Sequence, residues 1–319
     1  MNIAVLTSGG DSPGMNAAIR SIVKVGIRNH ISIYGIKYGY LGLYQNQIGL
    51  LKLEDVENII RMGGTFLGTS RFIEFIENTN IIKKSVQNLK NQDISFLIII
   101  GGNGSYKGAL KLIDFGVKCI GIPGTIDNDI SGTEFTIGFH TALNTIVEAI
   151  DKIKDTSKSH KRCTLVEVMG RQKGDLALYS SICSETTLVI VPEYNDSKLN
   201  ILKKMESFLD KEQSHAIVIL TERQFDINVL AKEIELVIGL ETKTTVLGHI
   251  QKGGIPLPQD RILGTLMGFY SIEMIRKNFF NIALGIRNNK IIHYPFKEVL
   301  EIKKDKIFQT LWEINSKLI

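Results

Sequence analysis

Three side chains that could carry out proton and phosphate chemistry stand within five residues of one another. Thr125, Asp127 and Asp129 belong to the segment Gly-Ile-Pro-Gly-Thr-Ile-Asp-Asn-Asp at residues 121–129. A hydroxyl beside two carboxylates can position an alcohol, accept its proton and face a metal-bound phosphate. The same nine residues also fit an ordinary surface turn rich in Asp and Asn. This segment alone therefore leaves both interpretations open.

The residues around this segment predict where it lies. The apolar run Cys119–Ile122 predicts a strand that leads directly into it, and Pro123 and Gly124 favour a tight turn. In open α/β sheets, ligands bind at the carboxyl ends of the strands. We therefore expect the hydroxyl and the two carboxylates at that edge of a sheet.

Three glycine-rich segments predict loops that bind anions. They are Gly9–Gly14, Gly63–Arg71 and Gly101–Ser105, and the first and third follow apolar runs. Glycine lets backbone N–H groups approach phosphate oxygens closely, and the guanidinium of Arg71 can pair with them. Glycines that only shape tight turns would explain one or two such loops, but three less readily.

The first glycine loop excludes two nucleotide-binding motifs. Asp11 stands where the dinucleotide fingerprint needs glycine, and its carboxylate would repel a pyrophosphate. This disfavours a nicotinamide-dependent oxidoreductase. No Gly-Lys-Ser/Thr follows any glycine run, so the chain has no P-loop. We expect Ser12 to cap the following helix and Pro13 to be its first residue.

One further tripeptide has a structural interpretation. Asp114-Phe115-Gly116 spells the metal-binding tripeptide of protein kinases, but the other kinase motifs are absent from its surroundings. We interpret it as the end of a helix that starts at Ser105, with Gly116 as its C-terminal cap.

Strand-like runs alternate with helical stretches along the chain. Between the first two runs, Met15, Ile19, Ile22 and Val23 keep the spacing of a helix buried on one side. This alternation predicts an α/β fold with mostly parallel sheets and helices on both faces. At 319 residues we expect roughly two domains, with crossings near Gly138 and near residues 253–258. The apolar runs are Ile3–Thr7, Ile31–Ile36, Phe96–Ile100, Cys119–Ile122, Thr164–Val168, Leu188–Val191, Ala216–Leu220 and Thr244–Leu247.

The amino-acid composition limits the classes of protein to which the chain can belong. The chain is 44% hydrophobic and 22% charged, as in ordinary globular proteins, and its net charge of +5 is too dilute to indicate nucleic-acid binding. Basic residues gather late in the chain, and we interpret them as a solvated helix face. They are Arg276, Lys277, Arg287, Lys290, Lys303, Lys304 and Lys306.

Cysteines, histidines and hydropathy exclude further classes. Three scattered cysteines form no disulfide framework, and the six histidines have no zinc-ligand spacing. We find no signal peptide and no apolar stretch long enough to span a membrane. The sequence therefore predicts a cytoplasmic protein without membrane or nucleic-acid partners.

Together the motifs resemble those of bacterial ATP-dependent 6-phosphofructokinases. The resemblance implies two three-layer α/β/α lobes with a cleft between them: residues 1–138 with 251–303 for ATP, and residues 139–250 with 304–319 for fructose 6-phosphate. It implies transfer of the ATP γ-phosphoryl to the sugar's 1-hydroxyl, the committing step of glycolysis. The matching segments are Gly9–Arg20, Gly63–Arg71, Gly101–Gly108, Gly121–Asp129, Glu167–Arg171 and Val246–Asp260.

The resemblance also implies roles for single residues. Asp127 corresponds to the general base, Thr125 and Arg171 to groups that face the transferring phosphoryl, and Asp129 to a carboxylate near Mg²⁺. The nucleotide positions are Gly10, Arg71, Phe72, Gly102, Asn103, Gly104 and Ser105. The sugar positions are Thr125, Asp127, Met169, Gly170, Arg171, Glu222, His249 and Lys252. Arg162 and Lys243 correspond to residues that reach the sugar phosphate from a neighbouring subunit, which implies a homotetramer.

Residue 104 bears on the phosphoryl donor. Pyrophosphate-dependent relatives have Asp there, which would crowd and repel the α-phosphate of a nucleotide, whereas Gly104 leaves room for ATP.

The chain departs from the family at position 103. Asn103 replaces an Asp near the metal-bound phosphates, so we expect weaker magnesium dependence or a lower rate. Two alternatives remain: a pyrophosphate-dependent enzyme, and a catalytically weak regulatory subunit that binds phosphosugar or nucleotide.

Other departures concern the sugar phosphate and effectors. Lys243 and Lys252 replace arginines, so we expect lower affinity for the sugar phosphate.

The positive charges of the family's effector site are kept at Arg20, Lys24, Lys154 and Lys211. Leu53, Thr187 and Gln213 replace an arginine, a glutamate and a lysine. These changes predict a weakened response to ADP or phosphoenolpyruvate.

Overall fold

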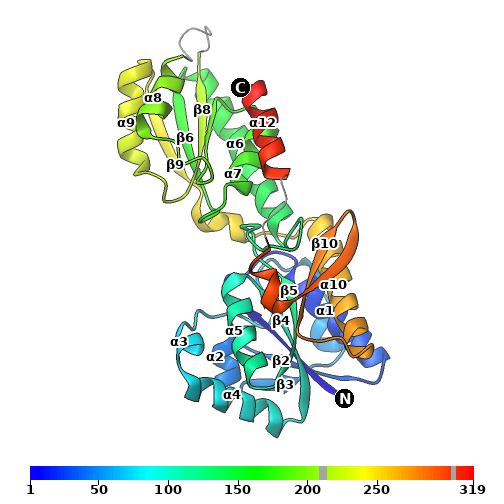
Figure 1. Cartoon of the computed structure of the whole chain (residues 1–319). Coiled ribbons are helices and arrows are strands. Elements are labelled where there is room, and N and C mark those ends of the chain that lie inside the picture. Colours follow the sequence, from blue (N-terminus) through cyan, green and yellow to red (C-terminus); the bar gives the residue numbers. More distant parts are fainter. Residues whose placement is uncertain (208–213, 303–306) are drawn as a thin grey trace. The chain divides into compact units, whose positions relative to one another are not determined.

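The chain folds into two compact units, each an α/β sandwich (Figure 1). The computed structural model describes residues 1–207, 214–302 and 307–319. Unit 1 comprises Met1–Thr141 and Lys252–Lys304, and unit 2 comprises Ala142–Gln251 and Asp305–Ile319. The predicted α/β class with mostly parallel sheets is confirmed. The assignment of ATP to the first unit and of the sugar to the second stays a prediction.

Unit 1 contains a seven-stranded sheet with the strand order β11-β10-β5-β4-β1-β2-β3. The five inner strands run parallel, and β3 and β11 pair antiparallel at the two edges. The strands are β1 (Asn2–Ser8), β2 (Ser32–Ile36), β3 (Ile48–Leu50), β4 (Ile94–Gly101), β5 (Lys118–Pro123), β10 (Ile282–Arg287) and β11 (Lys290–Pro295).

Helices cover both faces of this sheet because its inner strands are apolar on both sides. In β1, Ile3 and Val5 pack in the cluster with α1 and α10, whereas Ala4 and Leu6 pack in the cluster with α2 to α5. Figure 1 shows these two groups of helices on opposite sides of the strands. The helices are α1 (Met15–Arg28), α2 (Gly39–Tyr44), α3 (Glu74–Glu77), α4 (Thr79–Asn91), α5 (Asn103–Asp114), α10 (Pro258–Arg276) and α11 (Phe296–Val299).

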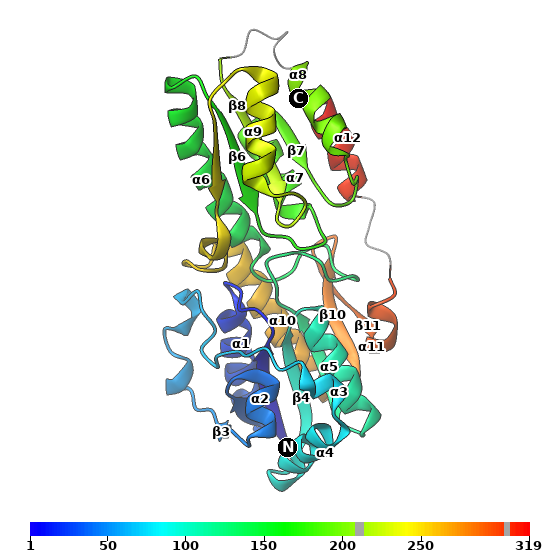
Figure 2. The ribbon, with the colours of Figure 1, turned by 90° about the vertical axis from the view of Figure 1, so that its left-hand side faces the viewer.

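Unit 2 is built on a smaller parallel sheet with the order β7-β8-β6-β9. Apolar side chains of α8 and α9, such as Ile201 and Ile234, share one buried cluster with Leu165 of β6, and Figure 2 shows α9 in front of the strands. The strands are β6 (Cys163–Val168), β7 (Leu188–Ile190), β8 (Ala216–Thr221) and β9 (Thr242–Val246). The helices are α6 (Phe139–Ser159), α7 (Asp175–Ser184), α8 (Lys198–Glu206), α9 (Ile227–Ile238) and α12 (Ile307–Leu318).

All eight predicted strands are present, but the hairpin β10–β11 was not predicted. Asn288 and Asn289, with φ of 50° and 60°, form its two-residue turn. Such turns need left-handed residues, and Asn tolerates that conformation, so the Asn-Asn pair between apolar runs was the available signal. Arg287 and Lys290 flank this turn. Their interpretation as part of a helix face is therefore wrong, and Lys303, Lys304 and Lys306 lie outside the described residues.

Of two predicted helix ends, the start of α1 is wrong and the end of α5 is confirmed. Ser12 does not cap α1, which begins at Met15 after Gly14; the Ser12 hydroxyl is buried and donates to Ile137 O at 2.8 Å instead. The predicted end of α5 is confirmed, although this helix begins at Asn103, two residues earlier than expected. Gly116 has φ of 85°, and its N–H donates to Ile113 O at 2.9 Å, as in a glycine-capped helix end.

In the part of the chain that the structure describes, no helix combines the length and the apolarity that crossing a membrane would need.

Close packing of α1 against α10 depends on two glycines. A Cβ on Gly264 would lie 2.7 Å from Gly14 O, and a Cβ on Gly268 would lie 2.5 Å from Ala18 O. Both neighbours are backbone atoms of the loop and helix that follow β1. The glycines therefore fix how closely α10 approaches the start of α1.

We expect Gly268→Ala to lower the free energy of unfolding by about 1–3 kcal/mol, because the added methyl group forces two helix backbones apart. Urea unfolding followed by circular dichroism measures this. Gly49→Ala is the matched control, since a Cβ at Gly49 meets no atom within 4 Å. Equal stability of the two variants would contradict the packing argument.

Candidate active site

In unit 1, the three predicted loops meet at the carboxyl ends of the neighbouring strands β1, β4 and β5. The Ser105 hydroxyl donates to Ser8 O at 2.9 Å, and Gly124 N–H donates to Gly101 O at 3.1 Å. The Thr69 hydroxyl donates to Gly9 O at 2.8 Å, which joins the Gly63–Arg71 loop to the first glycine loop. Parallel pairing therefore brings segments that are far apart in sequence to one edge of the sheet.

The loop after β4 presents free backbone donors. The first hydrogen bond at the start of α5 runs from Tyr106 N–H to Gly102 O at 3.1 Å. The N–H groups of Asn103, Gly104 and Ser105 therefore precede the helical ladder and, with the positive end of the helix dipole, favour an anion. A Cβ on Gly104 would meet no atom within 4 Å, so this position is open.

The loop after β5 carries the predicted catalytic residues and is tied to a returning segment. Thr125 N–H donates to Ile137 O at 3.1 Å, and the Thr136 hydroxyl donates to Thr125 O at 2.6 Å. Asp127 is 6% exposed, and its N–H donates to the Thr125 hydroxyl at 3.3 Å. Thr125 and Asp127 thus share one hydrogen-bonded turn after β5.

Asn103 contacts Asp129 directly. Its side-chain Nδ2 donates to Asp129 Oδ2 at 3.0 Å and to the backbone oxygen of the same residue at 3.2 Å. Both partners are acceptors, so the amide nitrogen, and not the amide oxygen, must face them. An Asp at position 103 would instead bring two carboxylates together. The substitution therefore replaces charge repulsion by a hydrogen bond.

The residues present fit a magnesium ion held mainly by substrate phosphates. Mg²⁺ in nucleotide sites is bound by one or two carboxylates together with phosphate oxygens. Asp129 would supply one carboxylate, and Asn103, whose Nδ2 donates to that carboxylate, would leave its Oδ1 as an additional neutral ligand. Within residues 1–207, 214–302 and 307–319, no three His, Cys, Asp or Glu side chains form a metal-binding group.

The remaining nucleotide and sugar residues of unit 1 lie around the glycine loops. Arg71 is exposed, and Phe72 packs on Tyr44 with ring centroids 5.9 Å apart. Lys252 Nζ lies 3.2 Å from where a Cβ on Gly10 would be. A residue predicted for the sugar phosphate and one predicted for the nucleotide are thus neighbours.

In unit 2, four of the predicted sugar residues meet beyond the carboxyl end of β6. Glu222 Oε1 accepts from Arg171 N–H at 3.3 Å, and a sharp turn forms at Gly170 and Arg171, whose φ values are 142° and 56°. Met169 N–H donates to Gln251 Oε1 at 3.0 Å. The sequence did not predict a role for Gln251, a buried carboxamide two residues after the exposed His249.

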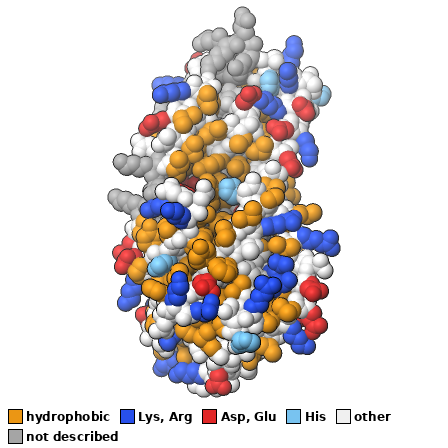
Figure 3. Space-filling view, turned by 90° about the vertical axis from the view of Figure 1, so that its right-hand side faces the viewer, with side chains coloured by type: hydrophobic (Ala, Val, Ile, Leu, Met, Phe, Trp, Pro, Cys, Tyr) orange, Lys and Arg blue, Asp and Glu red, His pale blue; other side chains and the backbone are white. Residues whose placement is uncertain are grey.

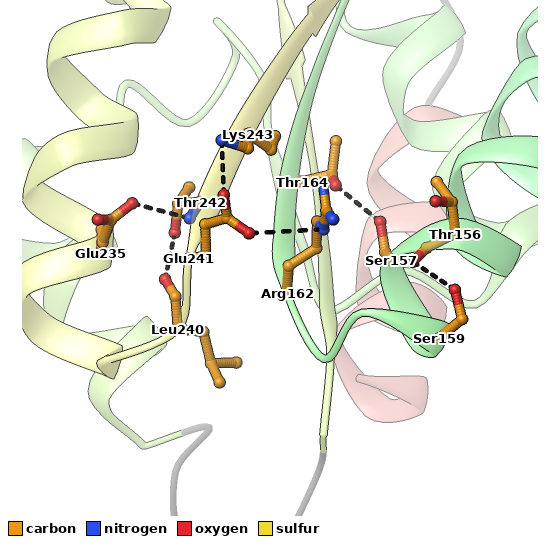
Figure 4. A network of polar contacts seen from close by, with 10 residues as sticks. All are labelled: Thr156, Ser157, Ser159, Arg162, Thr164, Glu235, Leu240, Glu241, Thr242 and Lys243. Atoms are coloured by element: carbon orange, nitrogen blue, oxygen red, sulfur yellow. Dashed lines mark hydrogen bonds and ion pairs between the residues drawn. The ribbon is translucent and has the colours of Figure 1, made fainter.

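Arg162 and Lys243 lie together at the other end of β6 (Figure 4). Glu241 binds both, with Oε1 2.6 Å from Lys243 Nζ and Oε2 3.8 Å from Arg162 Nε. The Lys243 hydrogen bond and charge, followed by the Arg162 charge, lower the pKa of Glu241. The six residues of β6 span about 20 Å at 3.3 Å per residue. These two cations and Arg171 therefore stand far apart within one chain.

The predicted effector residues fall into separate groups. Arg20 and Lys24 lie one turn apart on α1, and Lys154 lines a cavity of about 1060 Å³ in unit 2. Lys154 Nζ donates to Ser184 O at 3.0 Å and pairs with Glu185 at 3.2 Å. Lys211 and Gln213 lie outside the described residues.

The same cavity contains a titratable histidine. His215 lines it together with Lys154 and Lys158. Burial, followed by the charges of these two lysines, lowers the pKa of His215. Burial therefore favours the neutral imidazole of His215 in this cavity.

Unit 1 exposes an apolar stripe on α10. Ile262, Leu266 and Phe269 are 60%, 37% and 41% exposed and recur at helical spacing. Figure 3 shows hydrophobic side chains gathered on the face of the molecule that carries this helix. Such a stripe is typical of a protein interface.

This combination of fold and loops matches the phosphofructokinase family. The family model for phosphofructokinases matches residues 2–275, so the chain belongs to that family. An ATP-dependent 6-phosphofructokinase of Teredinibacter turnerae is 47% identical over 300 residues, 94% of this chain and 93% of that protein. One of Photobacterium profundum is 47% identical over 316 residues, 99% of this chain and 98% of that protein.

Solved structures of phosphofructokinases have the same fold as this chain. Phosphofructokinase from Saccharomyces cerevisiae has a TM-score of 0.86 at 32% identity over 99% of this chain, which spans only 47% of the yeast chain. A pyrophosphate-dependent phosphofructokinase from Marinobacter aquaeolei has a TM-score of 0.85 at 19% identity, covering 95% of this chain and 85% of that one. At that identity the likeness shows the fold alone.

We expect Asn103→Asp to strengthen magnesium binding, because it adds a carboxylate beside Asp129. Without Mg²⁺ the variant should melt below the parent, and added Mg²⁺ should raise its melting temperature more than it raises that of the parent. Differential scanning calorimetry with and without the ion measures this. Asn103→Ala, which removes the amide without adding charge, is the control. Stronger magnesium binding would be refuted if the kinetics and melting temperatures of Asn103→Asp were indistinguishable from those of the parent.

Proposed function

We propose that this protein transfers the γ-phosphoryl group of ATP to the 1-hydroxyl of fructose 6-phosphate, forming fructose 1,6-bisphosphate and ADP. The observation that carries the proposal is the convergence of three glycine loops on the turn of Asp127 and Asp129. The proposal draws further support from curated relatives of nearly equal length that are named ATP-dependent 6-phosphofructokinases.

Each catalytic residue has a distinct task in this reaction. The 1-hydroxyl oxygen attacks the γ-phosphorus, the bond to the β–γ bridging oxygen breaks, and the hydroxyl proton passes to the Asp127 carboxylate. Thr125 and Arg171 donate hydrogen bonds to the phosphoryl oxygens, where negative charge develops. The N–H groups at the start of α5 hold the nucleotide phosphates. Asp129 and the side-chain oxygen of Asn103 would hold Mg²⁺, which would supply neutralisation of the phosphate charge.

The open position at Gly104 favours ATP as the donor. An Asp there would place its carboxylate beside the N–H groups that an α-phosphate needs. A pyrophosphate-dependent enzyme is the second candidate, and a regulatory subunit with little turnover is the third, because of Asn103.

A coupled assay with fructose 6-phosphate and either ATP or pyrophosphate distinguishes these candidates. We expect turnover with ATP and Mg²⁺ and little with pyrophosphate. Asp127→Asn should lower kcat by about 10²–10⁴, because no base then accepts the proton. Asp93→Asn, an exposed acid before β4, is the control and should keep the parent's kcat. Ligand-induced melting shifts without turnover would instead support a regulatory subunit.

We also propose that the protein works as a homotetramer in which Arg162 and Lys243 of one subunit bind the sugar phosphate of another. The distance along β6 between these cations and Arg171 supports this arrangement, as does the exposed stripe on α10. Response to ADP or phosphoenolpyruvate is weak because Leu53 and Thr187 replace charged residues. The three free cysteines suit a reducing cytoplasm.

Lys243→Arg should lower KM for fructose 6-phosphate, because a guanidinium binds phosphate through two parallel hydrogen bonds and an ammonium does not. We expect kcat and KM for ATP to stay at the parent's values. Lys232→Arg, on the exposed face of α9, controls for the exchange itself. A KM for the sugar that does not fall counts against this role of Lys243.

A further inference from the structure

We propose that Asn128 is a positioning residue whose buried side chain holds the turn that presents Asp127 and Asp129. The inference rests on the proposed phosphoryl transfer and adds a residue to it. Asn128 is 1% exposed, so its side chain is not available to a substrate. Its effect on the reaction must therefore pass through the two acids that flank it.

The backbone at Asn128 has a conformation that few residue types adopt. Its φ is 49°, in the left-handed region, where Asn and Gly are tolerated far better than other residues. This left-handed residue turns the chain between the two acids. The identity of residue 128 thus affects the path of the backbone on both sides.

The Asn128 carboxamide uses both of its ends. Oδ1 accepts from Thr136 N–H at 3.1 Å, and Nδ2 donates to Glu134 O at 3.1 Å. Both partners are backbone groups of the segment that returns toward β5. Of the residues that tolerate this φ, glycine lacks both contacts and an ionised Asp lacks the donor. Asn is therefore the residue that satisfies the backbone and the two partners together.

The segment that Asn128 contacts is itself fixed to the sheet of unit 1. Ile137 N–H donates to Pro123 O at 2.9 Å, at the end of β5, and Glu134 N–H donates to Ile286 O at 2.9 Å, in β10. The carboxamide thus links the catalytic turn to two strands. Without it, the turn loses this connection, while the contacts near Thr125 and the bond from Asn103 to Asp129 remain.

Loss of this link should displace the acids but leave the glycine loops in place. A misplacement of about 1 Å can lower a rate by about 10²-fold. The expected signature is therefore a fall in kcat without a change in KM for ATP, since the N–H groups at the start of α5 do not depend on Asn128.

The first test compares Asn128→Gly with a matched control, Asn281→Gly. Asn281 has φ of 57°, and its Oδ1 accepts from Cys119 N–H at 3.1 Å, near the opposite end of β5. Both variants keep a left-handed residue and lose a side-chain hydrogen bond to a backbone N–H, from a buried side chain at Asn128 and a half-buried one at Asn281. We expect kcat to fall by about 10–10²-fold in Asn128→Gly only, with KM for ATP unchanged in both.

The second test uses pH and does not depend on the stability of the glycine variant. A protonated Asp at position 128 has the shape of the carboxamide and can donate to Glu134 O, whereas an ionised Asp repels that oxygen. The activity of Asn128→Asp relative to the parent should therefore be highest at acid pH and fall as pH rises. Among the residues that the structure describes, Asn281 uses only its acceptor, so Asn281→Asp should show no such pH dependence.

Hydrogen exchange separates a failure of this inference from a failure of the proposed function. The Thr136 amide should lose protection in Asn128→Gly and keep it in Asn281→Gly, whether or not the protein turns over. The role of Asn128 would be overturned if the parent were active and both glycine variants had equal kcat. It would also be overturned if the activity of Asn128→Asp relative to the parent did not depend on pH. A parent that shows no turnover with any donor would overturn the proposed function instead. In that case, unchanged protection of the Thr136 amide in Asn128→Gly would still refute the role of Asn128 in holding the turn.

Discussion

The parallel pairing of β1, β4 and β5 is the constraint on which the candidate site depends. Parallel neighbours end at the same edge of a sheet, so the loops that follow Ser8, Gly101 and Pro123 must meet there. Hydrogen bonds that cross from loop to loop then remove the remaining freedom, as between Ser105 and Ser8. The glycines let the loops approach one another closely, since a Cβ on Gly101 would lie 2.5 Å from Ser8 O.

Groups that favour anions and groups that oppose them meet at this edge of the sheet. The free N–H groups at the start of α5 and the Arg71 guanidinium favour anions, while Asp127 and Asp129 oppose them. Asn103 reduces that opposition by donating to Asp129. A cation is consequently less necessary for the protein's own stability than it would be with two adjacent carboxylates, and its binding depends more on the phosphates that arrive with it.

Local patterns predicted most of the fold but not its edges. Strongly apolar runs such as Phe96–Ile100 could only be buried strands, whereas β3 and β11 are short or half-exposed edge strands with no such signal. Ser12 shows why capping rules fail when tertiary contacts compete, because its hydroxyl is taken by Ile137 O, 125 residues away. Motif spacing identified the acids, but the partners of Asn128 and Gln251 depend on contacts that a linear sequence does not contain.

Strand length separates two groups of residues predicted to bind the sugar phosphate. Arg162 precedes β6 and Arg171 follows it, so the strand itself keeps their backbones apart. Glu241 holds Arg162 and Lys243 together and partly neutralises them. A phosphate dianion carries more charge than one carboxylate, so the pair of cations favours it over Glu241. The same strand that orders the residues at its carboxyl end thus holds a second group of cations at its amino end.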